Sequence, residues 1–285
     1  MHPVFLKIGP ISIRYYGLMY AIAFVVGIFL AKHEAKRRNI DVKLIEDYAV
    51  IAMLSGLIGG RLYYVILDWA FYSKHLSEIP AVWHGGMAIH GGIIGGIIGT
   101  IIFAKVKKVK IPVLFDISAL TIILGQAIGR IGNLMNGDAN GVPTIIPLKY
   151  MLNNKFMIWW HQYLKGLHTH VKALVPWGIT FPLSSPAGEQ FGLVPTHPTM
   201  IYEMILNFVA FLLLWFVFRK KKFAAGTLGG IYLIMYAFIR TIVTVFRADD
   251  LMLFGVRAPF VANFIMVIVG ILTIVFFNRK RVSKK

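Results

Sequence analysis

The stretch GQAIGRIGNLMNGDANG, residues 125–141, decides how the rest of the chain is interpreted, because it places an arginine and asparagines at the end of an apolar segment. Wound as a helix, it has one polar face, made of Gln126, Arg130, Asn133 and Gly137. An arginine at the centre of a bilayer costs about 2.5–3.5 kcal/mol on insertion scales, so its presence indicates function. A guanidinium beside a stripe of glycines suits a planar anion such as phosphate. The alternative is a helix-packing seam with an arginine that reaches the membrane surface.

The composition indicates a membrane protein. Of the 285 residues, 58% are hydrophobic and 15% are charged, which is too apolar for a soluble domain. The net charge of +18 does not indicate nucleic acid binding, because the basic residues occur in short runs between apolar spans. The absence of cysteine excludes disulfides, thiolate metal sites and a cysteine nucleophile. Since metal-binding and nucleotide-binding motifs are also absent, we expect neither a metal nor a cofactor.

Seven apolar segments approach or reach the roughly 20 residues that a helix needs to cross a bilayer. They cover residues 15–31, 48–67, 87–104, 113–135, 199–218, 227–246 and 260–277. The sequence therefore predicts an all-α polytopic membrane protein with seven transmembrane helices, in which residues 1–285 form a single catalytic domain. Residues 1–17 lack the pattern of a cleaved signal peptide.

Four basic runs predict the orientation. They follow the first, third, fifth and seventh spans, at residues 32–38, 105–110, 219–222 and 279–285. Because positively charged loops stay in the cytoplasm, we expect the N-terminus outside and the C-terminus in the cytoplasm. The long segment 142–196, between the fourth and fifth spans, then lies outside. Its aromatic stretch at 155–167 predicts either a helix among the lipid headgroups or a small folded cap.

The second and third spans combine glycines with one titratable residue. Small residues four apart, such as Gly56 with Gly60 and Gly91 with Gly95, let helix backbones approach closely. His90 lies one turn inside the third span, and imidazole exchanges protons near neutral pH. His90 is therefore a candidate catalytic residue, with a structural hydrogen-bonding histidine as the alternative.

Charged side chains recur near the outer ends of several spans. Glu203, in the fifth span, needs a cation partner because a lone carboxylate is costly in a membrane. The sixth span offers candidates on one helical face, namely Tyr236, Arg240, Thr244 and Arg247. The outer arginines are Arg61, Arg130, Arg240 and Arg247. Because carboxylates are few at this depth, the sequence predicts uncompensated cations that bind the phosphate of an anionic phospholipid.

Seven motifs follow one another along nearly the whole chain: RYYGLMY, GGRLYYV, GGMAIHGG, GRIGNLMNGDANG, HPTMIYE, YAFIR and FRADD. In order and spacing they resemble those of phosphatidylglycerol–prolipoprotein diacylglyceryl transferase, a family of bacterial lipoprotein maturation enzymes. The resemblance implies seven spans in the bacterial plasma (inner) membrane, an exterior N-terminus, and an active site toward the outer leaflet.

The resemblance also implies a reaction. A diacylglyceryl group passes from phosphatidylglycerol to the lipobox cysteine thiol of a prolipoprotein, which forms a thioether and releases glycerol phosphate. The resemblance places catalysis at His90, Arg240 and Tyr16. It places phosphatidylglycerol binding at Arg130, Asn133, Asn136 and Gly141, with supporting roles for Asp138, Glu203, Tyr236, Arg247 and Arg61. The base stays open between His90 and an arginine that only lowers the thiol pKa.

The chain departs from the family pattern at three positions. Asp138 and Thr244 stand where the family usually has Glu, and His84 where it usually has Asp. Without a carboxylate at Thr244, Arg240 or Arg247 lacks a partner unless a nearby aspartate supplies one, so a catalytically altered paralogue is an alternative. A transporter of anionic lipid or solute is another, since buried charges also mark transport paths.

Overall fold

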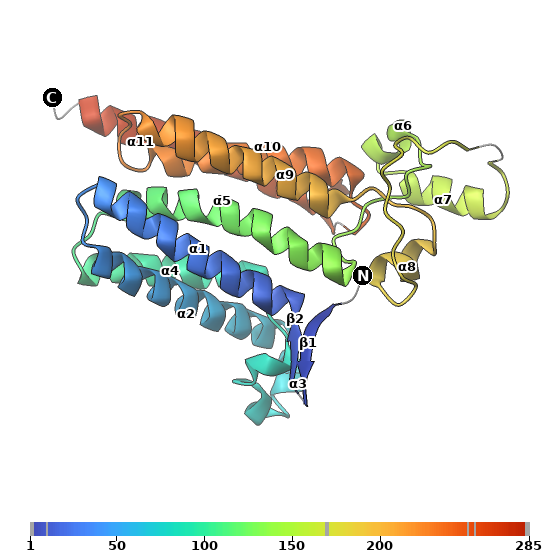
Figure 1. The fold of residues 1–285 in the computed structure, drawn as a ribbon, viewed down its shortest axis with the longest axis horizontal. Helices are drawn as coiled ribbons and strands as arrows, with labels where there is room; N and C mark the ends of the chain where they lie inside the picture. Colours follow the sequence, from blue (N-terminus) through green and yellow to red (C-terminus); the bar gives the residue numbers. More distant parts are fainter. Residues whose placement is uncertain (1–2, 10, 169–170, 250, 254, 283–285) are drawn as a thin grey trace. The chain divides into compact units, whose positions relative to one another are not determined.

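A computed structural model of the chain describes residues 3–9, 11–168, 171–249, 251–253 and 255–282 (Figure 1). Within these residues, seven helices are long and apolar enough to cross a membrane, as the sequence predicts. They are α1 (Tyr15–Arg37), α2 (Val42–Leu67), α4 (Ile89–Val106), α5 (Ile111–Asn136), α9 (Thr199–Leu212), α10 (Thr227–Phe246) and α11 (Ala258–Val282). A π-helical turn, η3 (Leu213–Val217), and a 3-10 turn, η4 (Phe218–Lys220), prolong α9. The protein is therefore a multi-pass membrane protein.

The helices extend beyond the apolar spans at their charged ends. α1 continues past residue 31 to Arg37, where Glu34 is buried and accepts hydrogen bonds from Arg37 and Arg38. Arg38 also pairs with the buried Asp116 at 3.1 Å. Hydropathy detects only the part of a helix that crosses lipid, whereas side-chain pairs one turn apart stabilise the helix beyond it.

The all-α prediction needs a correction, because two short antiparallel hairpins flank the helices. They consist of β1 (Val4–Ile8) with β2 (Ile11–Arg14) and of β3 (Met252–Leu253) with β4 (Val256–Arg257). Gly9 and Gly255 adopt positive φ values of 58° and 78° near the turns, a conformation that glycine tolerates without strain. These strands are too short to produce a clear alternation of apolar and polar residues in the sequence.

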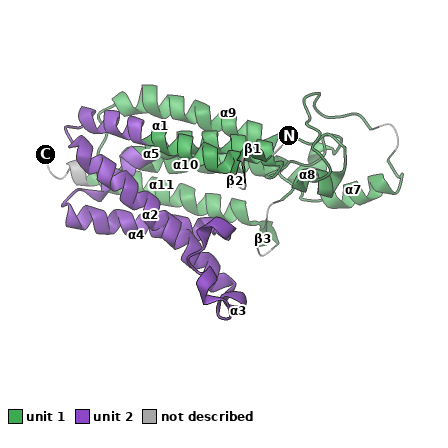
Figure 2. Cartoon of the chain, turned by 60° about the horizontal axis from the view of Figure 1, so that its bottom comes forward, with its two compact units in different colours: residues 1–27, 119–285 green, residues 28–118 purple. Residues whose placement is uncertain are grey.

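The chain, predicted as a single domain, groups into two compact units (Figure 2). The second unit, residues 28–118, contains α2 packed against α4. A Cβ atom at Gly91 would overlap the carbonyl oxygen of Gly59, and one at Gly95 would overlap that of Ser55. The prediction of close backbone approach between these spans is confirmed. The unit also holds α3 (Trp69–Tyr72) and the 3-10 turns η1 (Leu76–Glu78) and η2 (Val82–His84).

The first unit, residues 1–27 and 119–285, contains α9, α10 and α11. α10 packs against both of the other helices. A Cβ atom at Gly230 would lie 2.8 Å from the carbonyl oxygen of Gly270, so these glycines bring α10 and α11 together. Asn263 of α11 donates to the hydroxyl of Thr241 at 2.9 Å.

Residues 142–196, which we name the cap segment, fold around their own apolar cluster. The segment contains α6 (Leu148–Leu152), α7 (Phe156–Leu164) and α8 (Pro186–Phe191). The buried members of the cluster are Val142, Ile146, Met151, Phe156, Trp159, Trp160 and Phe191. The aromatic residues Phe156, Trp159 and Trp160 of α7 are therefore buried in this cluster.

Backbone hydrogen bonds tie the cap segment to the helix ends. Val142 donates to the carbonyl of Phe246 at 2.9 Å, and Ala248 donates to that of Asn140 at 3.1 Å. His197 donates to the carbonyl of Val142 at 2.9 Å. This junction holds the end of α5, the start of α9 and the end of α10 together, and so positions the polar side chains that they carry.

Candidate functional site

A single carboxylate joins two arginines inside the first unit. Glu203 of α9 is fully buried. Its Oε1 accepts a short hydrogen bond from Arg130 of α5, and its Oε2 accepts one from Arg240 of α10 at 3.2 Å. The prediction that Glu203 takes a cation partner from the sixth span is confirmed. The structure adds Arg130 as a second partner, so two guanidinium groups share one negative charge.

A second group surrounds Asp138, directly after α5. Tyr16 of α1 donates its hydroxyl to both carboxylate oxygens, at 2.6 and 2.5 Å. Asn133 donates to Asp138 at 2.7 Å, and Asn136 donates at 2.9 Å. Gly137 has φ +71°, a value that glycine favours, so the chain turns and returns Asp138 to the end of its own helix.

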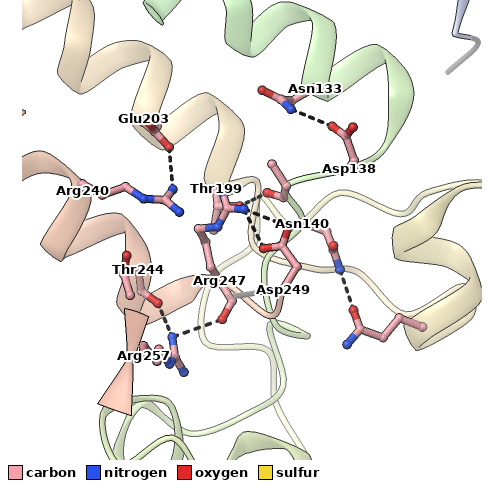
Figure 3. Close-up of polar contacts among 12 residues, drawn as sticks. Asn133, Asp138, Asn140, Thr199, Glu203, Arg240, Thr244, Arg247, Asp249 and Arg257 are labelled. Carbon is pink, nitrogen blue, oxygen red and sulfur yellow. Dashed lines mark hydrogen bonds and ion pairs between the residues drawn. The ribbon is translucent and has the colours of Figure 1, made fainter. Parts of the chain in front are cut away.

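Asn133 connects the two groups. Its Oδ1 accepts from Arg130 at 2.9 Å, and its Nδ2 donates to Asp138 and, at 2.5 Å, to the Tyr16 hydroxyl. The result is one continuous set of contacts, the polar network: Arg240, Glu203, Arg130, Asn133, Asp138, Tyr16 and Asn136. Figure 3 shows Arg240 directed at Glu203, and Asn133 at Asp138. Four helices that are distant in sequence thus supply one site.

Tyr236 lies on α10 one turn before Arg240. Its ring stacks on that of Tyr232, with centroids 6.2 Å apart. It is close enough to Glu203, Arg130 and Arg240 to interact with their charges. The supporting role that the family resemblance implies for Tyr236 stays a prediction.

Two further arginines lie where α10 ends. Arg247 pairs with Asp249 at 2.8 Å. Arg257, which sequence reasoning missed, is buried and donates to the backbone carbonyls of Thr244, Arg247 and Met151. Both arginines line a cavity of about 190 Å³, together with Asn154, Phe156, Met157, Ala248 and Met252. Arg257 could have been found in the sequence as an arginine just before the last span, separated from Arg247 only by the short connection between the sixth and seventh spans.

The structure explains how the chain does without a carboxylate at position 244. Thr244 is fully buried. Arg240 pairs with Glu203 and Arg247 pairs with Asp249, so neither depends on position 244 (Figure 3). Asp250, the other candidate partner, lies outside the described residues. The departure at Thr244 therefore no longer favours a catalytically altered paralogue.

Gly141 belongs to the junction between the cap segment and the helix ends. It forms a β-bridge with Arg247, and a Cβ atom there would overlap the carbonyl oxygen of His197. His197 is itself buried, and this burial lowers its pKa to about 4, so the imidazole is neutral at pH 7. The structure gives Gly141 a packing role, and the lipid binding that the resemblance implies for it stays a prediction.

Arg61 and His90 belong to the second unit. Arg61 is buried and donates to the backbone carbonyls of Glu78, Ile79, Gly85 and Gly86. It therefore holds the loop between α2 and α4. His90, at the start of α4, is exposed, and its ring lies 6.4 Å from that of Tyr63.

The expectation of four uncompensated outer cations is wrong. Arg130 and Arg240 share Glu203, Arg247 has Asp249, and Arg61 is held by carbonyl oxygens. Hydrogen-bonded partners from other parts of the chain offset the cost of burying these charges. Of these four arginines, Arg130 and Arg240 are bonded to the same carboxylate, that of Glu203, which makes this the candidate place for an anionic ligand.

Comparison of the sequence with known proteins identifies its family. The sequence model described as "Prolipoprotein diacylglyceryl transferase" matches residues 3–276. The chain belongs to the prolipoprotein diacylglyceryl transferase family. The match covers every residue of the polar network and Arg257, so family membership applies to the whole site.

Three relatives are named phosphatidylglycerol–prolipoprotein diacylglyceryl transferase. The one from Fusobacterium nucleatum subsp. nucleatum is 53% identical over 286 residues, covering 98% of this chain and 99% of the relative. The one from Geobacillus kaustophilus is 38% identical over 270 residues, covering 94% and 89%. The one from Thermosynechococcus vestitus is 34% identical over 266 residues, covering 93% and 88%. As a member of this family the protein is a transferase, which disfavours the transporter alternative.

Proposed function

We propose that the protein transfers the diacylglyceryl group of phosphatidylglycerol to the lipobox cysteine thiol of a prolipoprotein. The sulfur forms a bond to the terminal glycerol carbon of the diacylglyceryl group, and the bond from that carbon to the phosphate oxygen breaks. The products are a thioether and glycerol phosphate. The observation that supports the proposal is the polar network, in which two arginines share one carboxylate in a member of this transferase family.

Arg130 binds the phosphate of phosphatidylglycerol. Its planar fork of donors matches phosphate oxygens, and Glu203 and Asn133 hold the fork in one orientation. Asn133 and Asn136 bind the glycerol headgroup beside it. As the carbon–oxygen bond breaks, negative charge grows on the phosphate, and a fixed guanidinium stabilises that charge more than it stabilises the intact lipid.

Arg240 serves the thiol end of the reaction. It lies across Glu203 from Arg130, so the two guanidinium groups are held on either side of one carboxylate. A cation beside a thiol lowers the thiol pKa and favours attack by sulfur. His90 is exposed in the second unit. That it is a second residue facing the thiol stays a prediction.

The polar network faces the outer leaflet of the bacterial plasma membrane. The four basic runs lie in the cytoplasm together with the C-terminus, and the N-terminus and the cap segment lie outside. A secreted precursor then meets the enzyme on the side where its lipobox emerges. A cysteine introduced at Lys165 should react with an impermeant thiol reagent from outside, and one at Lys108 should not. The opposite pattern would contradict this orientation.

Product analysis tests the proposed function. Purified protein is mixed with phosphatidylglycerol and a lipobox peptide, and we expect glycerol phosphate release together with a peptide mass gain of one diacylglyceryl group. Arg130→Ala should lose transfer by about 100-fold or more, and Arg130→Lys should recover little of it, because an ammonium group lacks the fork. Arg279→Ala, which changes an exposed arginine of α11 outside the family motifs, is the matched control. Normal turnover in Arg130→Ala would remove Arg130 from the lipid site.

A further inference from the structure

Asp138 and Tyr16 form a short hydrogen-bonded pair beside the two arginines. The Tyr16 hydroxyl donates to Asp138 at 2.5 and 2.6 Å and accepts from Asn133 at 2.5 Å. Asp138 also accepts from Asn133 at 2.7 Å and from Asn136 at 2.9 Å. The Tyr16 hydroxyl directs its own proton at Asp138, and this carboxylate only accepts in these contacts, so Asp138 is where a proton passed on by Tyr16 would stop.

The transfer reaction needs such an acceptor. A cysteine thiol has an ordinary pKa of about 8.5, so at neutral pH it carries a proton that must leave when the sulfur–carbon bond forms. The S–H group becomes strongly acidic as sulfur gives its electron pair to carbon. A carboxylate is then a sufficient base, provided that a hydrogen-bonded path reaches it.

We propose that Asp138 accepts the thiol proton through the Tyr16 hydroxyl, an inference that rests on the proposed function. The Tyr16 oxygen takes the proton from sulfur while it gives its own proton to Asp138. The sulfur electron pair forms the carbon–sulfur bond, and the electrons of the carbon–oxygen bond leave with glycerol phosphate. Asp138 then passes the proton to this phosphate monoester, whose second pKa is about 6.

Other groups in the first unit are less suited to this step. The guanidinium groups of Arg130 and Arg240 stay protonated at any working pH. Both oxygens of Glu203 already accept hydrogen bonds from guanidinium groups. The titratable and charged groups that the network brings to Asp138 are Tyr16 from α1, Arg130 from α5 through Asn133, and Glu203 from α9 through Arg130.

The pH dependence of transfer tests the proposal. Transfer to a lipobox peptide is measured between pH 6.5 and 9.5 with phosphatidylglycerol in detergent, for the unmodified protein, Asp138→Asn and Tyr16→Phe. We expect both variants to lose about 100- to 10,000-fold at pH 6.5. The deficit should shrink by about tenfold per pH unit up to pH 8.5, because hydroxide then supplies the thiolate. Asp249→Asn is the matched control. It removes the carboxylate that pairs with Arg247, and any loss of transfer in this variant should be the same at every pH.

A second substrate distinguishes a loss of proton transfer from a structural defect in the variants. A lipobox peptide with selenocysteine in place of cysteine is already ionised at neutral pH, so it should restore most of the activity of Asp138→Asn at pH 7. A deficit that is the same at every pH and with both peptides would overturn the relay and leave Asp138 a purely structural role. An unmodified protein that forms neither thioether nor glycerol phosphate would overturn the proposed function, and the relay with it.

Discussion

Replacing Glu203 with Gln should destabilise the protein in a way that anionic lipid reverses. The Glu203 side chain is 1% exposed, and its partners Arg130 and Arg240 are 19% and 15% exposed. Breaking a fully buried ion pair costs about 3–5 kcal/mol. The amide that replaces the carboxylate can still accept a hydrogen bond, and both guanidinium groups are partly exposed, which reduces this cost. We therefore expect the free energy of unfolding to fall by about 2–4 kcal/mol. This corresponds to a fall of roughly 5–10 °C in the unfolding midpoint.

The anion dependence makes this prediction specific. Without the carboxylate, Arg130 and Arg240 lose the negative charge that joins them, and a phosphate can supply a negative charge in its place. Phosphatidylglycerol should therefore raise the unfolding midpoint of Glu203→Gln more than that of the unmodified protein, because a ligand stabilises the folded state according to its affinity.

The assay follows thermal unfolding in detergent micelles that contain either phosphatidylcholine or phosphatidylglycerol. Glu189→Gln, which changes an exposed glutamate of α8, is the matched control and should behave like the unmodified protein in both lipids. If phosphatidylglycerol raised the unfolding midpoint of Glu203→Gln and of the unmodified protein equally, the idea that Glu203 occupies the place of an anion between the arginines would be refuted.

The structure supports further predictions. Gly141→Ala should cost about 1–3 kcal/mol of stability, because its Cβ would overlap the carbonyl of His197; an unchanged unfolding midpoint would contradict the packing role. Thr244→Glu should lower stability and transfer, because it buries a carboxylate beside arginines that are already paired, and wild-type transfer would refute this. Arg257→Lys should cost about 1–3 kcal/mol, because one ammonium cannot serve the carbonyls that Arg257 contacts; chemical denaturation measures the loss. Since burial lowers the pKa of His197 to about 4, its contribution to stability is complete above pH 6.5 and disappears as the pH falls toward 4, a loss that His197→Gln should remove.

Much of the fold could be predicted because the membrane makes local sequence informative. A helix must be about 20 apolar residues long to cross, whatever it packs against, so each span could be found by itself. The same holds for the glycines of α2 and α4, since only a glycine allows helix backbones to approach so closely. The two hairpins escaped detection because strands of two to five residues have no reliable period.

The polar face of α5 and the need of Glu203 for a cation were also evident from the sequence. Helical periodicity places Arg130 and Asn133 on one side, and a buried carboxylate requires a counter-charge. Both inferences come from patterns within single helices. Such patterns indicate the charge or hydrogen-bonding type of the partner that a side chain needs, but they do not identify the residue that supplies it.

Only the tertiary structure decided the pairing. Helical spacing in the sequence made Arg240 and Arg247 equal candidates for Glu203. In the structure α10 ends at Phe246, Arg240 pairs with Glu203, and Arg247, just beyond the helix, pairs with Asp249. The sequence also did not show that the turn at Gly137 brings Asp138 within hydrogen-bonding distance of Tyr16 and Asn133. Ion pairs and hydrogen bonds form over about 3 Å, so they depend on the register between helices that are far apart in sequence, which hydropathy and periodicity within one helix do not contain.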